Sequence, residues 1–167
     1  MPVLSTIGIK ALYYAPINEA DPKKMPESGW KPVDVYQDTC TFVDKDPTIT
    51  THKSETSSKK IIQKSKEGSD LVFSIMDPSI DERVAFEGGE KGTDGSYNTY
   101  TEPETAKDIN LAFKVFPMDG LVLNIPCAAV SAKKNTTYSS KGISLLDVTA
   151  NPNGVITYSE NKTMPVE

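Results

Sequence analysis

Four carboxylates lie close together in the segment from Asp77 to Glu87, and they are the residues of this chain best placed for chemistry. The two between them are Asp81 and Glu82. Paired carboxylates work as a general acid and a general base when one cleft holds both and separates their pKa values. Acidic residues also gather at the start and on the solvent face of helices, so the surrounding pattern must decide between the two interpretations.

That pattern is typical of a short helix over residues 78–87. Asp77 is the expected N-cap, because its carboxylate can accept hydrogen bonds from the free N–H groups of the first turn. Pro78 then occupies the first helical position, where no N–H group is needed. Gly88 is expected to adopt the left-handed conformation that ends the helix.

The remaining helix residues divide into two faces. Ile80 and Val84 are four positions apart and share an apolar face. Arg83 and Glu87 have the spacing of an ion pair on the solvent side. The cap, the helix dipole and the solvent face account for all four acids, so the sequence favours a structural helix and predicts that the protein is not an enzyme.

Other residues with chemical potential are isolated. The single histidine, His52, lies in a predicted strand without a second histidine or a cysteine at metal-ligand spacing. The run GGEKGTDG lacks the Lys-Ser/Thr ending of a phosphate loop and reads as a flexible loop. Cys40 and Cys127 are predicted to be buried free thiols, with a disulfide as the alternative. No cofactor, metal ion or catalytic residue is expected.

The composition favours one acidic domain over residues 1–167. A net charge of -5 and a pI near 5.0 do not suit tight binding to phosphate backbones, which requires clustered Lys and Arg. No segment reaches the about 20 apolar residues of a membrane span, so no membrane contact is expected.

The hydrophobic pattern has a period of two. Residues 109–116 alternate like a half-buried strand, and the next strand contains Pro126, which indicates a bulge or a sheet edge. Short turns separate about eight such segments. We therefore expect a mainly β fold, a β-sandwich or barrel of about eight strands with one short flanking α-helix over residues 78–87.

Three segments do not fit a compact core. Residues 1–32 are expected to form an N-terminal arm and a Pro-rich loop, anchored by Trp30. Residues 88–106 read as a second long loop, and residues 159–167 as a flexible tail. Long loops in a compact domain usually serve a function or meet a partner.

The order of these parts is informative. The chain opens with IGIKALYYAPI and WKPVDVYQDT, and a strand then runs directly into a short helix ending in Gly-Gly, in KKIIQKSKEGSDLVFSIMDPSIDERVAFEGGE. The closing strands are DINLAFKVFPMDGLVLNIPCAAVSAKK and ISLLDVTANPNG. Over roughly residues 5–158 this order resembles the major tail tube proteins of long-tailed bacteriophages. The Pro-rich insert at 16–32 departs from the family pattern.

The resemblance implies a sandwich or barrel similar to the tube protein of type VI secretion. It implies hexameric rings that stack around a channel for DNA, in a virion tail assembled in the cytoplasm of a bacterial host. The implied partners are further copies of the chain, other tail proteins such as the tape measure and terminator proteins, and DNA that passes without specific binding. An acidic protein suits that channel because it repels phosphates.

The family's contacts between rings fall on an N-terminal arm and on a loop between early strands, here residues 1–20 and 44–60. The candidate contacts between subunits are Tyr13, Tyr14, Thr50, His52, Lys53 and Glu55. The alternative is another virion or tail component, or a β-sandwich binding module such as a tail terminator, decoration or adhesin-like protein, which forms no tubes.

Overall fold

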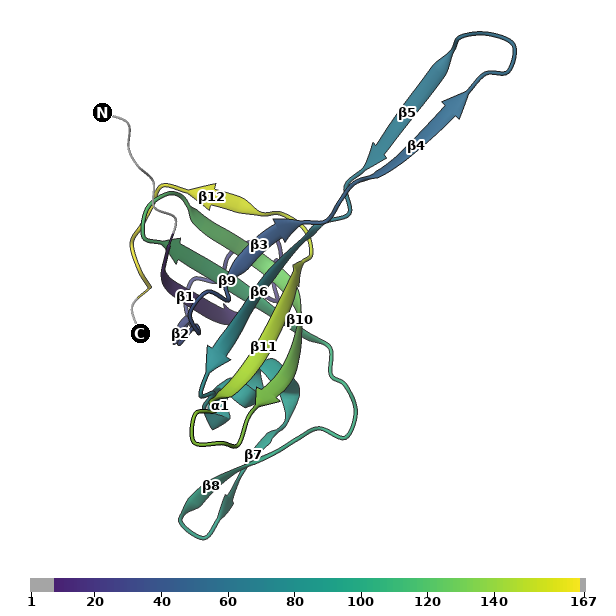
Figure 1. Cartoon of the computed structure of the whole chain (residues 1–167). Helices are drawn as coiled ribbons and strands as arrows, with labels where there is room; N and C mark the ends of the chain where they lie inside the picture. The colour runs from purple at the N-terminus through teal and green to yellow at the C-terminus, as the bar shows by residue number, and fades with distance from the viewer. Residues whose placement is uncertain (1–7, 166–167) are drawn as a thin grey trace.

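The computed structural model describes residues 8–165 (Figure 1). Strands make up 52% and helical residues 6%, so the predicted mainly β class with one short helix is confirmed. The helical segment is α1 (Ile80–Arg83), continued by the π-helical turn η1 (Val84–Gly88). The strands are β1 (Ile9–Pro16), β2 (Lys31–Val33), β3 (Thr41–Asp44), β4 (Thr48–Lys53), β5 (Lys60–Ser65), β6 (Ser69–Met76), β7 (Glu90–Asp94), β8 (Tyr97–Thr101), β9 (Ile109–Pro117), β10 (Val122–Thr136), β11 (Ser144–Pro152) and β12 (Thr157–Ser159).

The main sheet is antiparallel and has eight strands. Its order is β2-β1-β9-β10-β11-β6-β3, and β12 pairs with the start of β10. The sheet is curled, so that the chain after β2 lies beside β6. There the Tyr36 N–H donates to the Ser74 carbonyl at 2.8 Å, and Val35 forms an isolated bridge with Ile75. Within the described residues this bridge does not extend into a ladder, so the sheet is sandwich-like and not a closed barrel.

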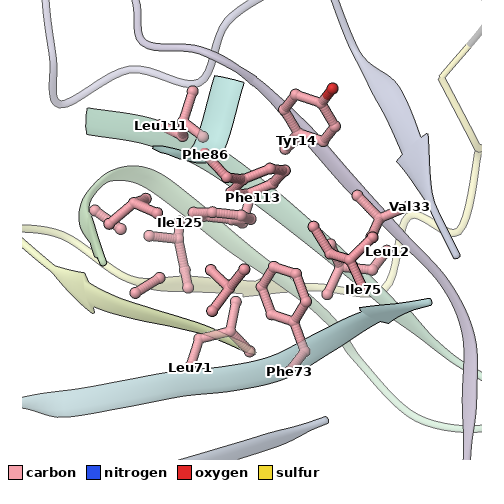
Figure 2. Close-up of a cluster of buried hydrophobic side chains, with 14 of the residues drawn as sticks. Leu12, Tyr14, Val33, Leu71, Phe73, Ile75, Phe86, Leu111, Phe113 and Ile125 are labelled. Atoms are coloured by element: carbon pink, nitrogen blue, oxygen red, sulfur yellow. The ribbon is translucent and has the colours of Figure 1, made fainter. Parts of the chain in front are cut away.

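Aromatic rings fill the centre of the curled sheet (Figure 2). Phe86 from η1 meets Phe73 and Phe113 at ring-centroid distances of 6.0 and 6.3 Å, and Tyr14 at 4.7 Å. Full burial of such a side chain contributes about 1.5–3 kcal/mol. The period-two pattern of β9 therefore directs Phe113 to the core as predicted, and η1 closes the core from the side.

A second apolar cluster lies on the opposite face of β1, β9 and β10. The Pro-rich segment covers it, with Trp30 buried and its indole N–H donating to the Pro26 carbonyl at 3.0 Å. The Lys114 ammonium lies 5.1 Å from the centre of the Trp30 ring, a cation–π contact. The members of this cluster are Tyr13, Ala15, Trp30, Ala112, Phe116 and Val122, with Met25 and Met164 packed against them.

Three expectations can be compared with this second cluster. Residues 109–116 form a strand that is buried on both faces in its middle, not half-buried, because Ala112 and Phe116 face the cluster. The predicted anchor Trp30 is confirmed, but its loop packs on the sheet. The predicted flexible tail holds Met164 against the same cluster, and the Tyr13 hydroxyl donates to its sulfur at 3.8 Å.

Further differences concern the arm, the second loop and the bulge. Of the predicted N-terminal arm, residues 1–7 lie outside the described residues, and β1 belongs to the main sheet. Residues 88–106, expected as a loop, contain the β7–β8 hairpin. The bulge at Pro126 is confirmed, since the pairing of β10 with β9 shifts register between Ile125 and Ala128.

Candidate assembly surface

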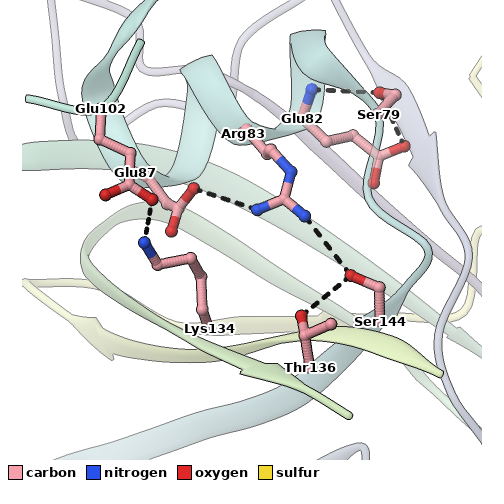
Figure 3. A network of polar contacts seen from close by, with 8 residues as sticks. All are labelled: Ser79, Glu82, Arg83, Glu87, Glu102, Lys134, Thr136 and Ser144. Carbon is pink, nitrogen blue, oxygen red and sulfur yellow. Dashed lines mark hydrogen bonds and ion pairs between the residues drawn. The ribbon is translucent and has the colours of Figure 1, made fainter. Parts of the chain in front are cut away.

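The helix that carries the clustered acids starts at Ile80, later than the predicted start at residue 78. The N-cap is Ser79, whose Oγ accepts from the Glu82 N–H at 3.2 Å and donates to the Glu82 Oε1 at 3.3 Å (Figure 3). Asp77 and Pro78 precede the cap, so their predicted capping roles are wrong. Asp77 has a φ of +47°, which aspartate tolerates better than most residues, and turns the chain from β6 into the helix. The Ser-x-x-Glu signature of a capping box marked the true start.

Arg83 joins this helix to the main sheet (Figure 3). Its guanidinium lies 3.6 Å from Glu87 Oε2 and donates to the Ser144 hydroxyl at 3.4 Å. The Arg83–Glu87 pair was predicted, but on the solvent side, whereas 22% and 10% of these side chains are exposed. Gly88 adopts the predicted positive φ, +87°, and does so at the end of a π turn.

Two of the four acids, Glu82 and Asp81, are held by contacts within the subunit. Burial raises the pKa of Glu82, and the charges of Asp34 and Asp77 act in the same direction. Burial, together with nearby Glu82 and Asp81, raises the pKa of Tyr14 to about 12. Glu82 contacts the cap and Asp81 pairs with Lys91 at 3.3 Å on the surface. Glu82 and Asp81 therefore both make contacts that stabilise the fold. Residues 8–165 contain no group of three or more His, Cys, Asp or Glu placed to hold a metal ion.

The most distinctive surface of the molecule is the β4–β5 hairpin, which projects away from the main sheet (Figure 1). It continues the pairing of β3 with β6, through the Lys45 N–H that donates to the Gly68 carbonyl at 2.8 Å. Lys45 also lies 3.7 Å from Asp70 at the base of the hairpin. Every residue from 43 to 67 is exposed. The hairpin therefore gains little stability from burial within its own subunit.

Three isoleucines on this hairpin are exposed to solvent. Ile49 is 57%, Ile61 48% and Ile62 53% exposed. An isolated two-stranded hairpin is marginal in water, and unpaired strand edges attract further strands. Covering one of these side chains is worth about 1.5–3 kcal/mol at most. The hairpin thus presents apolar side chains and unpaired strand edges to solvent.

The predicted contact residues divide into two groups. Thr50, His52 and Lys53 lie on β4 and Glu55 lies in the hairpin turn, all of them exposed. Tyr13 and Tyr14, in contrast, are buried inside the subunit. The expectation that these two tyrosines contact a neighbour is therefore corrected, because the alternating β1 strand sends one ring into each apolar cluster.

The sequence itself carries a signal for the exposed isoleucines. Ile61 and Ile62 are adjacent, so in a strand they face opposite sides and one core cannot bury both.

Cys40 and Cys127 are free thiols as predicted, and burial raises the pKa of each, to about 11 for Cys40.

No protein-family model matches this chain, and no curated protein sequence does either. Among the described residues, no helix combines the length and apolarity needed to cross a membrane.

Proposed function

We propose that this protein is a structural subunit that assembles with copies of itself through the β4–β5 hairpin. The assembly we infer is a hexameric ring, stacked into the tail tube of a phage or prophage, through which DNA passes. The neighbours in such a tail are further copies and other tail proteins such as the tape measure and terminator proteins. The observation that carries the proposal is the fully exposed hairpin of residues 43–67 with its three uncovered isoleucines.

Two other features support the proposal. The sandwich-like sheet with one short helix between β6 and β9 agrees with the order of elements on which the resemblance to tail tube proteins rests. The net charge of -5 suits a channel that must release DNA, because an acidic wall repels phosphates.

Electron microscopy tests the proposal most directly. Concentrated wild-type protein is expected to form rings or tubes in negative stain. In the matched variant an Asn-Gly turn replaces residues 46–67, which joins Lys45 to Gly68 at the point where they already pair. We expect this variant to retain its β-rich circular dichroism and to form no tubes.

Two outcomes contradict the proposal. One is a wild-type protein that stays monomeric in analytical ultracentrifugation at every concentration and salt. The other is a hairpin-replaced variant that assembles like wild type. A discrete oligomer without stacking favours the alternative of a non-tube tail component or binding module.

A further inference from the structure

Charge is distributed unevenly along this chain. Residues 48–66, which form the β4–β5 hairpin, contain five lysines and one glutamate, a net charge of +4. Residues 77–104, which form the helix and the β7–β8 hairpin, contain eight acids and two basic residues, a net charge of -6. An acidic protein therefore carries one distinctly basic projection.

The two charged segments lie at opposite ends of the molecule (Figure 1). Strand β6 separates them, since β5 leads into its first residue and α1 follows shortly after its last. Its eight residues span about 25 Å at the rise of an extended strand. The basic hairpin consequently cannot reach the acidic end of its own subunit, but it can reach that of a second copy.

Three of the five lysines of the basic hairpin, Lys53, Lys60 and Lys64, share one of its faces. Paired residues of an antiparallel ladder share a face, and residues alternate along each strand. The register places Lys53 opposite Lys60, and Ile49 opposite Lys64. The same face, here named the lysine face, also carries Ile62, opposite Thr51. The other face pairs neutral side chains: Thr48 with Ser65, Thr50 with Gln63 and His52 with Ile61.

The β7–β8 hairpin carries the complementary pattern. Glu90 and Asp94 are four residues apart on β7 and so lie on one face, where the register adds Tyr97 opposite Asp94. Both acids are exposed, and Tyr97 is 77% exposed. This acidic face thus offers two carboxylates and an aromatic ring, against lysines and isoleucines on the lysine face.

We infer that the lysine face of β4–β5 docks on the acidic face of β7–β8 in the next copy of the chain. This inference rests on the proposed function and names the surface that receives the hairpin. Donor and receiver are different surfaces at opposite ends, so the contact is head-to-tail, and it propagates along a stack when the rotation between successive copies does not close a ring. The charges steer the encounter, and the covered isoleucines and tyrosine supply the apolar area.

Charge reversal on each face, with a matched control, tests the pairing. The variant Lys53→Glu/Lys60→Glu/Lys64→Glu and the variant Glu90→Lys/Asp94→Lys are each expected to raise the protein concentration needed for assembly by about tenfold or more. The controls reverse the same number of charges on exposed residues outside both hairpins: Lys23→Glu/Lys24→Glu/Lys141→Glu for the first variant, and Glu19→Lys/Glu27→Lys for the second. Both controls are expected to assemble like wild type.

A mixing experiment with the two reversed variants distinguishes a loss of docking from damage to the fold. The two reversed variants together are expected to co-assemble, since the glutamates of one meet the lysines of the other. Assembly that persists in Glu90→Lys/Asp94→Lys overturns the inference. If the hairpin-replaced variant still fails to assemble in that case, the proposed function stands and only the receiving surface is wrong.

A second partner class gives a distinct result. Fluorescence anisotropy with a labelled DNA duplex is expected to show no difference in affinity between wild type and the lysine-face variant. Loss of DNA binding in that variant, with assembly unchanged, would assign the lysines to phosphate contacts and overturn the inference.

Discussion

Ser79 and Glu82 bond to each other at the start of the helix. The serine hydroxyl bonds both the backbone N–H and the carboxylate of Glu82, so this acid is committed to the helix start. A capping role requires a fixed carboxylate near one backbone group, whereas acid–base catalysis requires a proton that is exchanged with a substrate. The geometry therefore favours the capping role for Glu82.

Removal of the cap is expected to destabilise the protein. Ser79→Ala deprives the Glu82 N–H of its partner, and losses of this kind cost about 1 kcal/mol. The control is Asp77→Asn, which keeps a residue suited to positive φ and should cost less. Urea unfolding measures both. A larger loss in the Asp77 variant would return the capping role to that residue.

Glu82 also gives a pH dependence with a defined sign. Because burial raises its pKa above the ordinary 4.5, the folded protein keeps this proton to a higher pH than the unfolded chain. Its contribution to stability is complete below 4.5 and is lost as the pH rises through the raised pKa. The Glu82→Gln variant cannot ionise there.

We therefore expect the free energy of unfolding of Glu82→Gln, relative to wild type, to increase as the pH rises from about 4 to about 7. Urea titrations at several pH values measure this difference. The contributions of the other carboxylates cancel in it, because both proteins contain them. A difference that is constant with pH, or that falls, would show that this carboxyl group is not desolvated in the fold.

At the scale of elements, the short helical segment depends on one aromatic side chain. The helix is too short to be stable alone, and Phe86 is the residue by which η1 enters the core between Phe73 and Phe113. Phe86 is also the one fully buried residue of the π turn.

Truncation of this anchor is expected to be among the most damaging single changes. Phe86→Ala should lower the free energy of unfolding by about 3–5 kcal/mol, through lost burial and a cavity. The milder Phe86→Leu keeps most of the volume and should cost clearly less. Urea unfolding and near-UV circular dichroism report both. A cost below about 1 kcal/mol would mean that the helix is not anchored by this ring.

Features encoded locally could be predicted from the sequence. Strand β9 follows from its period-two pattern, and β4 and β5 follow from β-branched composition. The bulge at Pro126 and the glycine exit of the helix follow from the conformations allowed to proline and glycine. The β7–β8 hairpin was missed for a physical reason. Strand β7 is exposed at every position and β8 at three of five, so burial imposes no clear alternation on this Gly- and Thr-rich sequence.

Features that depend on distant segments could not be predicted. Tyr13 looked available for a neighbour, but the Pro-rich loop and Met164 come from opposite ends of the sequence to cover it. Only part of the candidate assembly surface could be predicted. Its position on residues 44–60 came from the resemblance, whereas the lysine face requires the register of β4 with β5.

At the scale of the whole molecule, stability is distributed in a way that suits assembly. The two apolar clusters hold β1, β9, β10 and the strands beside them, while the β4–β5 hairpin has only its own ladder. Regions with few buried contacts open at low free-energy cost, and those regions order when a partner covers them. A subunit that keeps its contact element poorly stabilised until it docks can remain soluble before assembly.

Hydrogen–deuterium exchange should show this contrast directly. In dilute protein the amides of residues 48–65 are expected to exchange fast, since both hairpin edges face water, while those of β9 and β10 exchange slowly. In concentrated protein the hairpin amides should become protected, and those of β7 and β8 with them if the two hairpins dock. The Glu90→Lys/Asp94→Lys variant should keep fast exchange in the hairpin at both concentrations. Hairpin amides that are as protected in the dilute protein as those of β10 would show that the hairpin is stable without a partner, and would remove the physical reason for the assembly it is proposed to drive.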